Sequence, residues 1–365
     1  MLGVLDRFVG RMALTRLGAI LCGLTALVIL VDFLDDGDQV LADGGQPALQ
    51  ILRYVLLRLP DTLSQMIPVA ALLAGVLTFA ELARQRELAV LFLAGVSRLR
   101  LAASLLPVAV VLGAVQFVID DRAVPLATQE LRHWGIGEYE TPDPDRFNWM
   151  RVGNDMVQYR LGPGQPPTLL QVELYRRDSE GTLLEVVRAA TASFEQQGWR
   201  LHDVIRTGKD RRETQATAEM LWAEGPQPSL VADISQPPEG RPFTELVSIV
   251  EHSGLGDYPP YVYELQLHER LMRPILTILL MLVGAALARP MPRRRTIGLF
   301  IAAGALLGLI WWLFGEVTTQ IAGLGLLPPV LAAWAPVILA VLVLWSGSIA
   351  RSVREPVPVS GSSAG

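Results

Sequence analysis

Charged and apolar side chains are spaced for protein binding in a short segment that joins two long apolar stretches. The segment from Phe79 to Arg100 reads FAELARQRELAVLFLAGVSRLR. Written as a helix, it has an apolar face whose residues recur at i, i+3, i+4 and i+7: Leu88, Leu91, Phe92 and Gly95. Another face would carry Glu81, Arg84 and Gln85. This pattern predicts a docking helix for a partner; the alternative is an interfacial helix that lies on the lipid surface and binds nothing.

Residues that perform catalysis or bind metals do not occur here at the spacings that such chemistry needs. The phosphate-loop pattern GxxxxGK[ST] is missing, because Gly208-Lys209 lacks a glycine at the required distance upstream. His202 has no nucleophile or metal-ligand pattern around it, and Asp120-Asp121 is an acidic pair without a histidine. We therefore expect no catalytic residue, metal or cofactor in this chain. A membrane-embedded enzyme of envelope assembly and a passive scaffold remain the alternatives.

The composition places the chain in a lipid bilayer. Of its 365 residues 51% are hydrophobic, and the mean hydropathy is +0.37, which is too apolar for a soluble domain of this length. A hydrocarbon core of roughly 30 Å is crossed by about 20 apolar residues in a helix. Six stretches are predicted as spans: 17–34, 62–80, 101–119, 275–288, 297–321 and 329–349. A long polar insert separates the third span from the fourth.

Arginine collects in alternate connections between the predicted spans, which predicts their orientation. Positive side chains near the ends of spans are retained on the cytoplasmic side. The arginines on this side lie before span one, between spans two and three, between four and five, and after six: Arg7, Arg11, Arg16, Arg84, Arg86, Arg98, Arg100, Arg289, Arg293, Arg294, Arg295, Arg351 and Arg354. The opposite side carries Asp35, Asp36, Asp38 and Asp43. Both termini are therefore predicted in the cytoplasm, and the net charge of -5 gives no indication of nucleic-acid binding.

A cleaved signal peptide is the competing interpretation of the first apolar stretch. Leu17 to Leu34 follows a basic segment, and Val40-Leu41-Ala42 loosely resembles a processing site. The stretch is longer than the roughly 7 to 15 residues of a typical signal core, so we interpret it as a span. Its Cys22 is the single cysteine of the chain and is interpreted as a packing residue.

The insert at 135–262 shows strand patterns rather than helical ones. Leu170 to Arg177 alternates apolar and polar residues, Asp178 to Gly181 is typical of a turn, and Leu183 to Val187 resumes the strand. Two further candidate strands are Ala192–Phe194 and Trp199–Arg206. These patterns favour a β-sandwich or an open roll, whose role would be binding or end-to-end joining with another β domain through an exposed edge.

Several fragments along the chain resemble the lipopolysaccharide export permeases LptF and LptG, and more closely the LptG branch. The fragments are Val4–Arg11, Ile67–Leu73, Arg86–Leu88 with Ala94–Ser97, Tyr175–Trp199, Glu264 with Arg270 and Pro274, and Leu327–Pro329 with Trp334 and Pro336. Each alone is weak, whereas their order and spacing are specific and cover nearly the whole chain. The resemblance implies an α-helical integral membrane protein of six transmembrane helices (3+3) with an inserted extracytoplasmic β-jellyroll-like domain.

The expected domains follow from this layout. Spans one to three and a cytoplasmic coupling helix at about 79–95 occupy 1–134, the periplasmic β-jellyroll-like domain occupies 135–262, spans four to six occupy 263–350, and a disordered cytoplasmic tail occupies 351–365. The resemblance also implies a multi-pass location in the bacterial inner membrane.

By the resemblance, the chain is one half of a transporter. The implied partners are an LptF-like permease subunit, a dimer of an LptB-like ATPase, and LptC-like and LptA-like periplasmic β-jellyroll proteins. ATP and Mg²⁺ would be bound by the ATPase and not by this chain. The coupling helix would fit a groove on the ATPase, and Glu87 occupies the position of the family's characteristic acidic residue.

The cargo implied is lipopolysaccharide, which would enter sideways from the outer leaflet of the inner membrane. Such an amphiphile needs an apolar cleft and cations at its outer rim. The candidate lipid contacts are Arg53, Arg58, Arg132, Arg270 and Arg273. Arg132 also matches an arginine that contacts lipid phosphate in related proteins. The alternative for each is snorkelling to the interface or pairing with Asp120, Asp121, Glu264 or Glu269.

The chain departs from the LptG pattern where some of these proteins carry lysines. Ile29, Asp35 and Asp36 stand at the outer end of span one, and Asp61 stands before the proline motif of span two. Either the cargo carries less phosphate, or the arginines take over the contacts.

Spans one and five are expected, by the resemblance, to form moving walls against the partner subunit. Gly304 and Gly308 form a GxxxG motif in span five and are the candidates for that interface, with packing inside the chain as the alternative. Glu316 in the same span is either a functional carboxylate or a hydrogen-bond partner of Thr318, Thr319 or a neighbouring helix.

Overall fold

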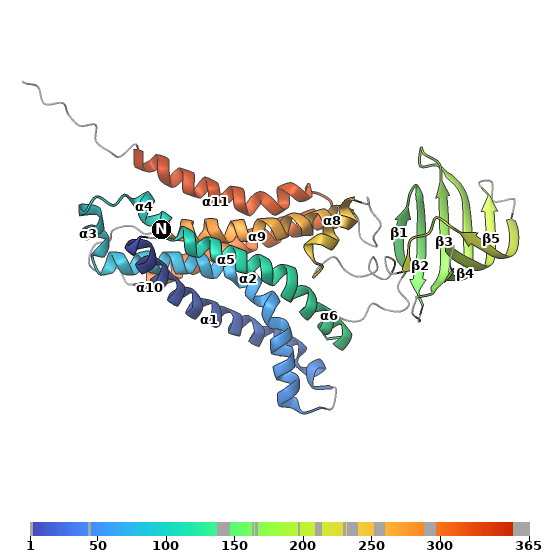
Figure 1. Ribbon diagram of the computed structural model, residues 1–365, viewed down its shortest axis with the longest axis horizontal. Helices are drawn as coiled ribbons and strands as arrows, with labels where there is room; N and C mark the ends of the chain where they lie inside the picture. Colours follow the sequence, from blue (N-terminus) through green and yellow to red (C-terminus); the bar gives the residue numbers. More distant parts are fainter. Residues whose placement is uncertain are drawn as a thin grey trace, which may run out of the picture. The chain divides into compact units, whose positions relative to one another are not determined.

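The chain folds into two compact units, seen in the computed structural model of Figure 1. The structure describes residues 3–42, 45–136, 147–162, 164, 167–195, 198–208, 214–228, 231, 240–251, 260–287 and 297–352. The helical unit comprises Met1–Ala127 and His268–Gly365, and the sheet unit comprises Thr128–Leu267. Both boundaries fall inside helices, namely α6 (Val124–Trp134) and α9 (Pro260–Leu287).

Long apolar helices make up the helical unit, as the composition predicts. Within the described residues, five helical segments are long and apolar enough to cross a membrane: Val4–Ala42 (α1), Pro47–Arg84 (α2), Tyr261–Leu287 of α9, Ala302–Gly323 of α10 (Ile297–Gly323) and Pro329–Ser346 of α11 (Pro329–Ser352). At 1.5 Å per residue, α1 with its 39 residues is about 58 Å long. It is therefore much longer than a hydrocarbon core of roughly 30 Å.

The third predicted span is built from several shorter helical pieces. After α4 (Arg98–Ala103), α5 (Leu106–Val118) runs for 13 residues, and a π-helical turn, η1 (Ile119–Ala123), leads into α6. A helix of 13 residues is about 20 Å long, which is too short to cross the bilayer alone. The charged residues of η1 interrupt the apolar run at this point.

Several predicted charges and the predicted tail fall on parts of the chain that the structure does not describe. Arg289, Arg293, Arg294, Arg295, Arg354 and Asp43 lie outside the described residues. Of the predicted tail, Arg351 and Ser352 end α11, and 353–365 lie outside the described residues.

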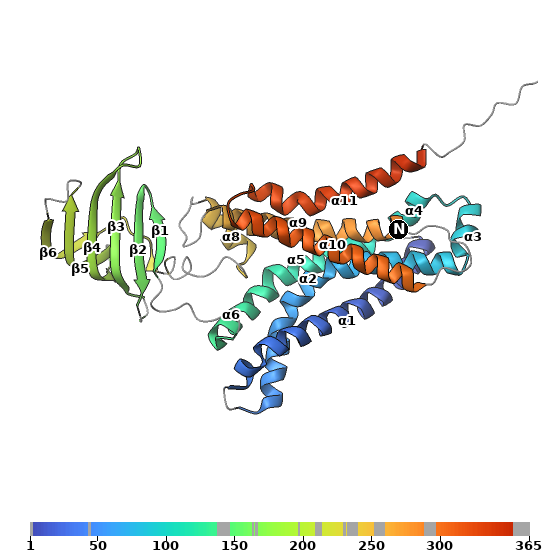
Figure 2. The ribbon, with the colours of Figure 1, turned by 180° about the vertical axis from the view of Figure 1, so that it is seen from behind.

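Small residues let the central helices of the unit touch. A Cβ added to Gly75 of α2 would lie 2.5 Å from the carbonyl oxygen of Met281 of α9, so only glycine permits this backbone approach. Beside this crossing, Leu72, Leu280 and Trp311 belong to one buried cluster to which α2, α9, α10 and α11 all contribute. Figure 2 shows α10 next to α9 in the view from behind.

The sheet unit contains six antiparallel strands in the order in which they follow along the chain. They are β1 (Asn148–Val152), β2 (Asp155–Leu161), β3 (Leu169–Arg177), β4 (Leu183–Glu195), β5 (Gly198–Gly208) and β6 (Thr214–Trp222). The predicted hairpin 170–187 is confirmed, and the Asp178 side chain accepts backbone N–H groups in its turn. Fully buried tryptophans, Trp199 and Trp222, anchor its core.

Two features of the sheet unit differ from the strand prediction. The candidate strand Ala192–Phe194 is the second half of β4, because β5 pairs along nearly all of that strand. The insert also contains helix α8 (Phe243–Glu251), whose Leu246 and Ile249 pack against Tyr263 at the start of α9. The insert is therefore not purely β-structure.

Candidate functional site

The predicted coupling helix at about 79–95 is two helices separated by a turn. α2 ends at Arg84, and α3 occupies Glu87–Leu93. Between them Arg86 adopts a φ of 62°, in the left-handed region that non-glycine residues rarely enter and that stops an α-helix. Gly95, with a φ of 83°, turns the chain after α3. A Cβ added to it would have no neighbouring atom within 4 Å.

The apolar face of α3 packs on the core of its own chain. Leu88 is 4% exposed and belongs to a buried cluster formed with α1, α2 and α5, and Leu91 and Phe92 pack against that cluster. Val90 and Leu93 instead point outward and are 64% and 89% exposed. Of the predicted docking residues, Leu88 is thus buried within the chain, Leu91 and Phe92 are half-buried and Gly95 is exposed, while Val90 and Leu93 are also open to a partner. Docking by this helix stays a prediction.

Polar side chains gather at the junction between α2 and α3. Glu81 accepts hydrogen bonds from Arg84 and from Gln85, whose Nε2 lies 2.6 Å from Oε1. Glu87 opens α3, and its Oε2 is buried without a hydrogen-bond partner among the described atoms. Since a buried carboxylate oxygen without a donor is costly, a donor from outside the chain would stabilise it.

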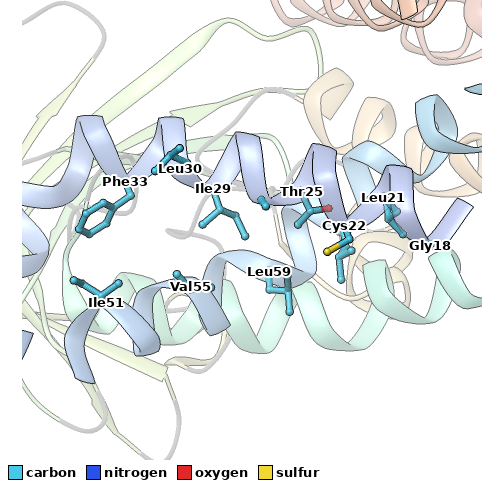
Figure 3. A pocket seen from close by; sticks show the side chains of 12 residues that line it. Gly18, Leu21, Cys22, Thr25, Ile29, Leu30, Phe33, Ile51, Val55 and Leu59 are labelled. Carbon is cyan, nitrogen blue, oxygen red and sulfur yellow. The ribbon is translucent and has the colours of Figure 1, made fainter. Parts of the chain in front are cut away.

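An apolar groove lies between α1 and α2 (Figure 3). It has a volume of about 630 Å³ and extends from Gly18 to Phe33 along α1. On the α2 side, the groove is lined by every fourth residue of that helix: Ile51, Val55, Leu59 and Leu63. This spacing puts all four on one helix face, a signal that the sequence contained but that was not predicted as a site. Ile29, one of the positions that departs from the LptG pattern, lines the groove.

Polar contacts lie beside the end of the groove that is nearest the α1–α2 turn. The Arg58 guanidinium is 3.2 Å from the Asp32 carboxylate, and both side chains are largely buried. The buried Tyr54 donates its hydroxyl to Asp36 Oδ2 at 2.9 Å. Arg58, predicted as a lipid contact, therefore already has an acidic partner within the chain.

A second group of charges lies where η1 faces α9. Arg270 Nη1 is 3.7 Å from Asp121 Oδ1, and Arg273 Nη1 is 3.7 Å from Asp120 Oδ1. Arg273 Nη2 is also 3.3 Å from Glu269 Oε2. We call these five residues the ion cluster. The structure thus shows Arg270 and Arg273 paired with aspartate and glutamate, which was the alternative considered for them. A contact of either arginine with lipid stays a prediction.

The π-turn brings consecutive carboxylates to one side of the helix. A π-turn inserts an extra residue into the helical repeat and is often found at functional sites. The Asp120 side chain is 2% exposed, and its Oδ2 has no hydrogen bond within the described part of the chain. Thr319 of α10 donates to Glu269 Oε1 at 2.7 Å, which ties α10 to the ion cluster. The sequence analysis identified the acidic pair and considered its pairing with the candidate arginines, which the structure shows for Arg270 and Arg273.

The remaining two candidate lipid contacts, Arg53 and Arg132, lie outside the groove and the ion cluster. Arg53 is an exposed residue of α2, and Arg132 is a half-buried residue of the last turn of α6. Neither lines the groove between α1 and α2. Their predicted role as lipid contacts stays a prediction.

The GxxxG motif of α10 faces a helix of the same chain. A Cβ added to Gly304 would lie 3.0 Å from Leu73, and one added to Gly308 would lie 2.9 Å from Val69, both in α2. The glycines therefore serve packing inside the chain, and their contact with a second subunit stays a prediction. Glu316 accepts a hydrogen bond from Gln320 at 2.9 Å, one turn further along α10.

Comparisons with known proteins identify a matching family and several relatives. The chain matches the family of the lipopolysaccharide export system permease LptF/LptG over residues 7–349. It is 23% identical over 342 residues to the lipopolysaccharide export system permease protein LptG of Escherichia coli K12, covering 92% of this chain and 94% of that protein. It is 21% identical over 352 residues to LptG of Haemophilus influenzae, covering 94% and 98%.

The long apolar helices fit a multi-pass protein of the bacterial inner membrane. Among the described residues no group of three or more histidine, cysteine, aspartate or glutamate side chains is arranged to hold a metal ion. Since the family match spans far more than half of its length, the chain belongs to the lipopolysaccharide export system permease family LptF/LptG.

Proposed function

We propose that this chain is the permease subunit of an ABC transporter that extracts lipopolysaccharide from the outer leaflet of the inner membrane. The observation that carries the proposal is the apolar groove between α1 and α2, which ends beside polar and charged residues. Such a site suits a cargo with acyl chains and a polar head. The arginine distribution supports an orientation with both termini in the cytoplasm and the sheet unit in the periplasm.

Energy would come from a partner, since the chain has no phosphate loop. An LptB-like ATPase dimer would hold ATP and Mg²⁺ and contact the outward face of α3, where Val90 and Leu93 are exposed. The buried, unsatisfied oxygen of Glu87 beside this face offers an acceptor for a donor of the ATPase. An LptF-like subunit would complete the membrane part.

The sheet unit would hand the lipid to a periplasmic bridge. Its six strands are ordered from β1 to β6, so β1 and β6 form the two edges of the described sheet. Edge strands can pair with strands of another domain. LptC-like and LptA-like β-jellyroll proteins are the proposed recipients.

Photo-crosslinking from the groove tests this function. A photoreactive amino acid at Leu30, which lines the groove, should crosslink to lipopolysaccharide in the purified complex with its ATPase. Leu27 is the matched control, because it is 58% exposed on the same helix, close to the 56% of Leu30, but does not line the groove. Equal crosslinking at both positions would argue against a lipid site in the groove.

ATP hydrolysis separates a transporter from an enzyme or a scaffold. Crosslinked lipid should decrease when ATP is added to the wild-type complex and stay constant with a hydrolysis-deficient ATPase. Loss of lipid that is independent of ATP would contradict the proposal.

A further inference from the structure

The groove between α1 and α2 contains a polar group that the chain leaves unbonded. Thr25 lines the groove and is buried, and its Oγ1 has no hydrogen-bond partner among the described atoms. Burying a hydroxyl without a partner costs free energy. An occupant that carries an oxygen, such as an acyl chain with an ester or hydroxyl group, would supply the missing hydrogen bond.

One end of the groove lies beside an acidic surface. Phe33 and Ile51 lie at this end in Figure 3, on the stretches of α1 and α2 that precede and follow the turn between them. Within residues 29–42 and 45–63 the chain carries five aspartates and two arginines. We call the aspartates the acidic rim; they are Asp32, Asp35, Asp36, Asp38 and Asp61.

The acidic rim is not neutralised by the nearby arginines. Arg58 is already paired with Asp32, at 3.2 Å, and five carboxylates against two guanidinium groups leave an excess of three negative charges. Asp35 and Asp38 are exposed residues of α1 that do not line the groove but follow within five residues of Phe33, at this end of it. In the ion cluster, Arg270 and Arg273 face three carboxylates. These two arginines therefore bring no surplus positive charge to a bound head group.

We propose that the groove holds an acyl chain of a glycolipid whose head group, at the acidic rim, carries few or no phosphates and presents hydroxyl groups. A phosphate would meet carboxylates of its own sign, which repel it at short range. Sugar hydroxyls instead can donate hydrogen bonds to carboxylate oxygens. The inference rests on the proposed transport of lipopolysaccharide. It specifies that the transported lipid carries little negative charge on its head group.

Binding of three matched lipids tests the inference. The probes are acylated diglucosamine lipids with identical acyl chains and two, one or no phosphates, titrated into the complete complex in nanodiscs. We expect the lipid without phosphate to bind about tenfold more tightly than the lipid with two, and the difference to shrink at high salt. The double variant Asp35→Lys/Asp38→Lys should abolish or reverse this preference for the lipid without phosphate.

A control variant and a chelator complete the experiment. Glu180→Lys/Glu224→Lys makes the same change of net charge at exposed positions of the sheet unit and should leave the order unchanged. Equal or tighter binding of the lipid with two phosphates overturns the inference. So does tight binding of that lipid that requires Mg²⁺ and is lost with a chelator, because a cation would then bridge phosphate and rim.

A conservative substitution separates this inference from the proposed function. Thr25→Val keeps the shape of the side chain but removes its hydroxyl, and should weaken all three lipids several-fold and equally. If the three lipids bind equally well and Thr25→Val weakens each, lipid binding in the groove stands and the inference about phosphate fails. If no lipid binds the wild-type complex, the proposed function itself fails.

Discussion

Replacing Leu93 by glutamate tests which face of α3 meets the ATPase. Leu93 is 89% exposed, so almost its whole apolar surface is available to a partner. Full burial of a leucine side chain contributes about 1.5–3 kcal/mol. Because 1.4 kcal/mol corresponds to a factor of ten, Leu93→Glu should weaken ATPase binding by about 10- to 100-fold. The measurement is ATPase binding to the permease complex in nanodiscs.

A buried residue of the same helix provides the contrast. Leu88 is 4% exposed, and Leu88→Ala should lower the stability of the permease by about 2–5 kcal/mol, which thermal unfolding detects. Leu93→Glu should leave the unfolding temperature nearly unchanged, since an exposed substitution usually changes stability by less than about 0.5 kcal/mol. Wild-type ATPase binding by Leu93→Glu, together with lost binding by a stable Leu88→Ala protein, would refute the assignment of the faces.

Three further predictions follow from the helical unit. Glu87→Lys should lower co-purification of the ATPase and leave membrane insertion intact; unchanged co-purification would count against a coupling role. Asp120→Ala should destabilise the permease in thermal unfolding by less than the about 3–5 kcal/mol of a fully unpaired buried charge, because Arg273 loses one acidic partner and keeps Glu269. Gly75→Leu should prevent correct packing of α2 on α9, seen as faster proteolysis, whereas the same change at Gly18, which has open space around its Cβ, should not.

The prediction of local structure succeeded where neighbouring residues carry the signal. The alternation in Leu170–Arg177 reproduces β3, and the turn at Asp178 is formed by its own side chain. The range of the third span, 101–119, agrees with α4 and α5, but the break between them and the charged π-turn at Ile119–Ala123 were not predicted; the π-turn faces charges on α9, far away in the sequence. Periodicity within a segment cannot report a partner that lies in another segment.

For the candidate site residues, too, the local pattern was predicted correctly, but the contacts with other segments were left open. Periodicity correctly grouped Leu88, Leu91 and Phe92 on one face of α3, but it could not tell whether that face meets a partner or the chain's own core. Likewise, the sequence identified Arg270 and Arg273 as cations near a span end, and the structure places them in ion pairs. Amphipathicity and charge describe a face, whereas its neighbour is decided by the fold.

The sequence by itself determined the family, the apolar helices and the strand pattern of the insert, because fragment order, hydropathy and alternation are properties of consecutive residues. Only the tertiary structure decided that Val90 and Leu93 are exposed on α3, that α1 and α2 enclose a groove, and that five charged residues form the ion cluster. The physical reason is that burial, cavities and ion pairs arise between helices that the chain brings together from distant positions.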